Sequence, residues 1–128
     1  MKIEHIGYQV LDPVKVVAWY VEHLGFSVKR RMEQSPWAHF LADDSGQVMI
    51  EIYHNPDAPM PDYASMNPLV LHLAFVAEDV EAERDRLLAA WATADGEIEE
   101  TPAGDRVAML RDPWGFPIQL CKRAKAMI

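Results

Sequence analysis

Two histidines stand at matching places in two similar stretches of this chain. His5 opens residues 5–12 (HIGYQVLD), and His72 opens residues 72–79 (HLAFVAED). Each histidine lies in an apolar run, and each stretch ends in an aspartate suited to capping a helix. The offset between the copies is 67 residues for the histidines (5 to 72) and for the aspartates (12 to 79). This spacing indicates an internal duplication.

Two further polar residues follow the same repeat. Glu51 comes after the turn-like residues 43–46 (DDSG), and Gln119 comes after residues 112–115 (DPWG). The offset between the copies is 69 residues for these turns and 68 residues for Glu51 and Gln119. Imidazole nitrogens, a carboxylate and an amide oxygen suit a divalent first-row metal. A lone strand histidine is more often a satisfied core or surface residue, so the repeat-related coincidence carries the argument. We predict that His5, Glu51, His72 and Gln119 bind one divalent ion (Ni, Co, Zn, Mn or Fe), with positions left open for water or substrate.

These residues need strands to position them, and the hydrophobic pattern predicts such strands. In the first half, residues 2–10, 26–32, 37–42 and 47–53 alternate or run apolar as strands do, and a helix is expected from Pro13 to the C-cap Gly25. The second half repeats this plan, with strands at 69–76, 97–100, 106–111 and 116–122 and a helix after Asp79. The fold class predicted is α+β, with two tandem βαβββ units forming a curved mixed sheet around a central cleft.

The two units are expected to share one domain, residues 1–128. The first unit covers residues 1–54 and the second covers residues 69–128. The joint at 55–68 belongs to a stretch, residues 54–68, that holds four of the nine prolines. A stiff joint of this length suits a lid, an arm that reaches a neighbouring subunit, or a plain surface crossover.

Strand parity predicts which side chains face the cleft. Ile6, Tyr8 and Val10 are the natural partners of the first helix, which leaves His5 on the open face of the sheet. By the same period of two, His72, Glu51 and Gln119 point away from the helices, and the small residues Gly7 and Ala74 leave room beside the histidines. Other residues could contact a substrate, although aromatic residues at strand spacing are more often core and exposed strand arginines usually bind nothing. Candidates for an apolar wall are Tyr8, Trp37, Met109 and Trp114, and candidates for binding an anionic group are Arg30, Arg31, Arg106 and Arg111.

Charge and composition exclude several classes of partner. A formal net charge of −8 argues against nucleic acid and against an anionic membrane surface. No apolar run approaches the roughly 20 residues that span a bilayer. Cys121 is the single cysteine, so no internal disulfide is expected and a reducing cytoplasm is the default location. Cys121 itself is expected to be a small buried hydrophobe.

The chain resembles the vicinal oxygen chelate superfamily of glyoxalases, bleomycin-resistance proteins and extradiol dioxygenases. The matching stretches are residues 5–7 (HIG), residues 19–26 and residues 112–120 (DPWGFPIQL), which is the most specific. The resemblance implies metal ligands at the first and fourth strands of each unit, here His5, Glu51, His72 and Gln119. It also implies a small-molecule substrate and a homodimer, whose units pair within one chain or are exchanged between two. The ligand pattern is similar to bacterial-type glyoxalase I, in which glutamate stands in place of Gln119.

Three functions remain open at this stage. A divalent ion with one carboxylate and three neutral ligands leaves a net charge of +1 at the site. A lyase or isomerase would use this charge to stabilise an enolate or enediolate oxygen, with Glu51 as the candidate base. The amide of Gln119 cannot accept a proton, unlike the glutamate that glyoxalase I carries there. An extradiol dioxygenase is the second possibility, although the resemblance then places the carboxylate in the other unit. The third is a metal-free binding protein of the bleomycin-resistance kind, so whether the chain is an enzyme stays open.

Overall fold

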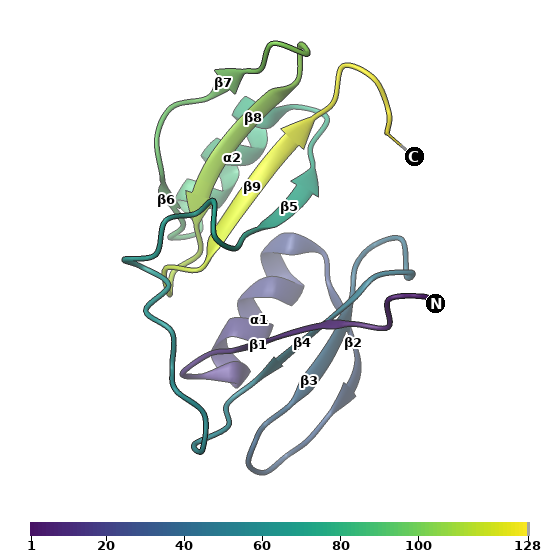
Figure 1. Ribbon diagram of the computed structural model, residues 1–128, viewed down its shortest axis with the longest axis vertical. Coiled ribbons are helices and arrows are strands. Elements are labelled where there is room, and N and C mark those ends of the chain that lie inside the picture. The colour runs from purple at the N-terminus through teal and green to yellow at the C-terminus, as the bar shows by residue number, and fades with distance from the viewer. Residues whose placement is uncertain (128) are drawn as a thin grey trace. The chain divides into compact units, whose positions relative to one another are not determined.

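The computed structural model describes residues 1–127 and divides into two compact units, Met1–Pro61 and Asp62–Ile128. Each unit is a small mixed sheet with one helix against one of its faces (Figure 1). The unit boundary therefore falls inside the proline-rich joint.

The first unit follows the order strand, helix and three strands. Its elements are β1 (Ile6–Gln9), α1 (Pro13–Leu24), β2 (Ser27–Arg31), β3 (His39–Ala42) and β4 (Met49–Tyr53). The strand order in the sheet is β1-β4-β3-β2, with β1 parallel to β4 and the other pairs antiparallel. The Asp12 carboxylate caps α1 by accepting the Lys15 amide at 3.2 Å, and Gly25 ends the helix at a φ of 74°.

Alternation along β3 and β4 separates a helix-covered face from an open face. Leu41, Ile50 and Ile52 are fully or almost fully buried, as are Val16 and Tyr20 of α1. The residues between them on β3 and β4 point to the opposite side of the sheet, which is called the open face below. Glu51 is one of these residues, because it lies between Ile50 and Ile52.

The second unit repeats the plan with one addition. Its elements are β5 (Leu73–Val76), α2 (Val80–Ala89), β6 (Thr93–Ala94), β7 (Glu99–Glu100), β8 (Arg106–Arg111) and β9 (Pro117–Lys122). The strand order is β5-β9-β8-β6, with β7 also paired to β8. Asp79 caps α2 by accepting the Ala82 amide at 2.9 Å. Leu87 of α2 packs into a core that includes Leu110 and Ile118, all three fully buried.

Each half of the proline-rich joint is held by its own unit. Gln9 donates to the carbonyls of Ala58 and Pro59, both at 3.0 Å, and accepts the Asn55 amide at 2.6 Å. In the second unit, Arg111 donates to the carbonyls of Tyr63 at 2.6 Å and Met66 at 2.9 Å. The joint is therefore held by hydrogen bonds at both ends and is not a free linker.

The prediction of two βαβββ units in an α+β fold is confirmed, and the differences lie at element ends. β1 is shorter than residues 2–10, so His5 stands one residue before the strand. β5 begins at Leu73 instead of Leu69, because Asn67 starts a turn by accepting the amides of Leu69 and Val70. Sequence did not predict the two-residue β6. Within residues 1–127, neither helix is long and apolar enough to cross a bilayer.

Candidate metal site

His5 and Glu51 lie side by side on the open face of the first sheet. The His5 Nε2 is 3.4 Å from a Glu51 carboxylate oxygen, and Glu51 has a side chain that is 22% exposed. β1 and β4 bring them together, because Gly7 pairs with Glu51 and His5 lies two residues before Gly7. The expectation that these two residues share the face away from α1 agrees with this geometry.

Two neighbours fix the His5 ring. Glu4 accepts a hydrogen bond at His5 Nδ1, and the Phe40 ring meets the imidazole edge-on with centroids 5.3 Å apart. The hydrogen bond that His5 donates to Glu4 raises the pKa of His5 above its ordinary value, and the charges of Glu4 and Glu51 act in the same direction. The raised pKa favours the imidazolium, whose Nε2–H faces Glu51, so a metal ion would bind His5 by replacing that proton.

The absence of a side chain at Gly7 gives the Glu51 carboxylate its place. A Cβ at Gly7 would lie 3.1 Å from the nearer Glu51 oxygen and 3.4 Å from the Tyr53 ring. The first distance is tighter than ordinary van der Waals contact. Gly7 thus leaves the space that the sequence analysis expected beside the histidine.

The second unit carries the related pair in the same strand register. Ala74 pairs with Gln119 as Gly7 pairs with Glu51, and His72 lies two residues before Ala74. His72 donates a hydrogen bond from Nδ1 to the Pro68 carbonyl at 2.8 Å. In the neutral imidazole this leaves Nε2 as the nitrogen with a lone pair. The Gln119 side-chain oxygen accepts the Cys121 thiol at 3.1 Å. Cys121 is buried as expected, and burial raises the pKa of its thiol.

The spacing of the His5–Glu51 pair fits a divalent ion. Donor atoms about 2.0–2.1 Å from one ion and separated by a tetrahedral angle lie about 3.3 Å apart. The 3.4 Å between His5 Nε2 and Glu51 matches that spacing. Among residues 1–127 the structure gathers no group of three His, Cys, Asp or Glu side chains that could hold a metal. Each unit carries two of the four predicted ligands, and the four-residue site stays a prediction.

Several residues expected near the substrate serve other purposes. Tyr8 is buried on the helix-covered face, and Trp37 lines a hollow of about 260 Å³ beside Val14 of α1, so neither lies on the face of His5. Arg106 pairs with Glu81, while Arg111 pairs with Asp95 at 2.7 Å and holds the joint. Ile6, expected against α1, is instead 47% exposed. Met109 pairs with Gln119 across β8 and β9 and so lies on the same face of the second sheet.

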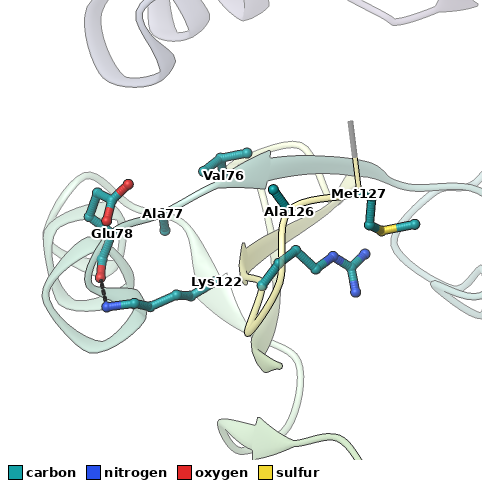
Figure 2. A pocket seen from close by; sticks show the side chains of 7 residues that line it. Val76, Ala77, Glu78, Lys122, Ala126 and Met127 are labelled. Carbon is teal, nitrogen blue, oxygen red and sulfur yellow. Dashed lines mark hydrogen bonds between the residues drawn. The ribbon is translucent and has the colours of Figure 1, made fainter. Parts of the chain in front are cut away.

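A larger hollow of about 570 Å³ lies in the second unit where β5 and β9 end. Figure 2 shows side chains that line it, among them Val76 and Ala77 from the end of β5 and Ala126 and Met127 from the segment after β9. Its cations are already paired: Lys122 donates to the Glu78 carbonyl at 2.7 Å, and Arg123 forms an ion pair with Asp105 at 2.7 Å. This apolar hollow includes none of the residues predicted to bind the metal.

Sequence reasoning missed three contributors to this region. Glu4 and Phe40 contact His5. Gln9, which is buried at the end of β1, hydrogen-bonds the joint. A carboxylate next to a candidate ligand was a usable signal for Glu4. The position of Phe40 depends on strand pairing, which the pattern of single strands does not give.

Comparison with known proteins identifies the family of this chain. A family model described as the Glyoxalase/Bleomycin resistance protein/Dioxygenase superfamily matches residues 2–120. A probable lactoylglutathione lyase of Vibrio cholerae is 28% identical over 131 residues, which cover 98% of this chain and 93% of that protein.

Solved structures agree. A glyoxalase family protein from Bacillus cereus superposes with a TM-score of 0.80 at 16% identity, covering 98% of this chain and 95% of its own. TnmS3, an antibiotic binding protein from Streptomyces sp. CB03234, is 26% identical with a TM-score of 0.69, covering 97% and 99%. The repeated strand plan, with histidines at matching places in its two halves, thus has a family: this chain belongs to the Glyoxalase/Bleomycin resistance protein/Dioxygenase superfamily.

Proposed function

We propose that this chain is a divalent-metal-dependent lyase or isomerase that acts on a small carbonyl compound. In this proposal His5, Glu51, His72 and Gln119 bind one ion (Ni, Co, Zn, Mn or Fe). The similarity to a probable lactoylglutathione lyase supports the reaction class. The observation that carries the proposal is the His5–Glu51 pair, whose donor atoms lie 3.4 Å apart on an open sheet face.

The bound ion would act as a Lewis acid that stabilises negative charge developing on a substrate oxygen. The chain's own residues supply the rest. Glu4 and Phe40 hold the His5 ring, so its Nε2 is fixed without the ion. Glu51 is the candidate base for a proton next to the substrate carbonyl, because it is the single carboxylate among the four proposed ligands. Gln119 offers an oxygen donor but cannot take a proton.

Metal analysis of the purified protein tests the proposal first. We expect a stoichiometric divalent ion that is lost when both His5 and His72 are replaced by alanine. Turnover of the methylglyoxal–glutathione hemithioacetal then tests the reaction class. Replacing Gln119→Glu adds a second carboxylate able to move a proton, so any isomerase rate should rise. An unchanged or lower rate would count against a missing base, and metal-free protein would overturn the metal site itself.

A second candidate function is a metal-free protein that binds a small molecule and catalyses no reaction. It is favoured by the 26% identity to TnmS3, which is an antibiotic binding protein, and by the Cys121 thiol that already occupies the Gln119 oxygen. Metal-free protein that still binds an aromatic ligand would support this alternative. Oxygen consumption with a catechol would instead support a dioxygenase. Sedimentation measurements would test the homodimer that we propose for either activity.

A further inference from the structure

Arg30 lies on the same face of the first sheet as His5 and Glu51. The strand registers place Arg30 opposite Phe40, Phe40 opposite Glu51 and Glu51 opposite Gly7. Residues that oppose one another in neighbouring strands point to the same side. Arg30, Phe40 and Glu51 therefore form a row across β2, β3 and β4 on the open face.

A β-bulge gives Arg30 this position. Val28 pairs with Leu41 and Arg30 pairs with Phe40, so Lys29 is the extra residue of β2. In an unbroken ladder Lys29 would oppose Phe40, and Arg30 would oppose His39 on the face that α1 covers. Bulges commonly redirect a side chain beside a functional site. Here the bulge turns a guanidinium towards the face that carries the proposed metal ligands.

Arg30 has no counter-ion among residues 1–127. Its side chain is exposed and forms no hydrogen bond or ion pair with another described residue. The next residue, Arg31, points to the opposite face and is paired with Glu33 at 2.9 Å. A guanidinium without a carboxylate partner is suited to bidentate binding of an incoming carboxylate.

The row also has the dimensions of a substrate site. Adjacent strands lie about 4.8 Å apart, which separates β2 from β4 by roughly 10 Å. Phe40 lies between these ends and contacts His5 at 5.3 Å between ring centroids. A ligand along this row would meet an aromatic floor between a cation and the His5–Glu51 pair.

We propose that Arg30 binds a carboxylate of the substrate and thereby selects acid-bearing compounds. The inference rests on the proposed function, because it assumes that neighbouring substrate oxygens bind the metal ion held at His5 and Glu51. The substrate class is then a carbonyl or vicinal-diol compound whose acid group lies up to roughly 10 Å from those oxygens. An apolar or aromatic segment would join the two ends over Phe40.

Calorimetric titration of zinc-loaded protein under argon tests this selection. The probes are 3-(3,4-dihydroxyphenyl)propionate and its methyl ester, which differ in charge and share the vicinal oxygens. We expect the native protein to bind the acid at least tenfold more tightly than the ester, with a preference that shrinks as salt is added. Arg30→Gln should bring the two affinities within about twofold, while Arg30→Lys should keep part of the preference.

Arg31→Gln is the matched control, because it removes the same charge one residue away on the opposite face. It should leave the acid preference unchanged. A preference that survives in Arg30→Gln, or that disappears equally in Arg31→Gln, would overturn the inference. The same holds if native protein loads with zinc but shows no preference, and the metal site then stands. If native protein binds none of Ni, Co, Zn, Mn and Fe, the proposed function fails together with the inference.

Discussion

At the scale of single residues, the candidate site depends on what is missing at position 7 as much as on its ligands. Gly7 allows the Glu51 carboxylate to lie over β1, next to His5. The residue in the matching register of the second unit is Ala74, opposite Gln119. At this place the two halves of the repeat differ by one methyl group, and the half with glycine carries Glu51.

This difference predicts the effect of Gly7→Ala. The added Cβ would stand 3.1 Å from a Glu51 oxygen and would push the carboxylate away from His5. We expect the affinity for a divalent ion to fall about tenfold, within the range seen when groups that orient ligands are changed. Calorimetric metal titration measures this, with thermal unfolding to show that the fold persists.

Ala74→Gly is the matched control for that variant, since it removes a methyl group at the repeat-related place. It should leave metal affinity within about twofold of the native value. Equal metal affinity in Gly7→Ala and the native protein would contradict the role given to Gly7.

At the scale of elements, strand parity is the part of the fold that sequence predicted best. A period of two placed Glu51 and Gln119 on the face away from the helices, and the burial of Ile50, Ile52 and Ile118 agrees with it. Parity fails where the ladder is irregular. The extra residue at Lys29 shifts Arg30 to the open face, and nothing in a single strand's pattern announces such a bulge.

Strand ends were predicted less well for a similar reason. Residues 69–72 are apolar enough to continue β5, but the turn at Asn67 keeps them out of the sheet. Residues 2–5 alternate in the sequence as a strand would, but β1 begins only at Ile6, where pairing with β4 begins. The exposure of Ile6 follows from the same limit, because apolar type does not reveal whether a neighbouring element covers it.

Helix α1 provides a prediction about acid stability. The Lys15 side chain and amide both hydrogen-bond the Asp12 carboxylate, which lowers the pKa of Asp12 in the folded protein. A lowered folded pKa contributes stability that is present above the unfolded value near 3.9 and is lost as pH falls through the folded value. Asp12→Asn keeps a capping oxygen but removes this titration.

We therefore expect the free energy of unfolding of Asp12→Asn to fall less than that of the native protein between about pH 5 and pH 2. Denaturant unfolding at several pH values measures both slopes. At pH 7, Asp12→Ala should cost about 0.5–2 kcal/mol, because α1 then lacks its cap. Parallel slopes for native protein and Asp12→Asn would contradict the role of the Asp12 carboxylate.

At the scale of the whole molecule, the duplication gives each unit one pair of the predicted metal ligands. Each unit is a compact sheet and helix with its own stretch of the joint, yet neither gathers three acidic, histidine or cysteine ligands within the described residues. The net charge of −8 favours cations in general but does not set their number. That number has to follow from how the four donors are divided.

This division predicts one tightly bound ion per 128-residue chain, shared by both halves of the repeat. Two imidazoles, one carboxylate and one amide complete a single coordination set with open positions, whereas two donors alone bind a divalent ion weakly. His5→Ala and His72→Ala should therefore each lower the metal content from about one ion per chain towards zero. Elemental analysis after gel filtration measures this content. Two ions per chain, or a single variant that retains half of the metal, would mean that each unit binds its own ion, and the four-residue site would have to be abandoned.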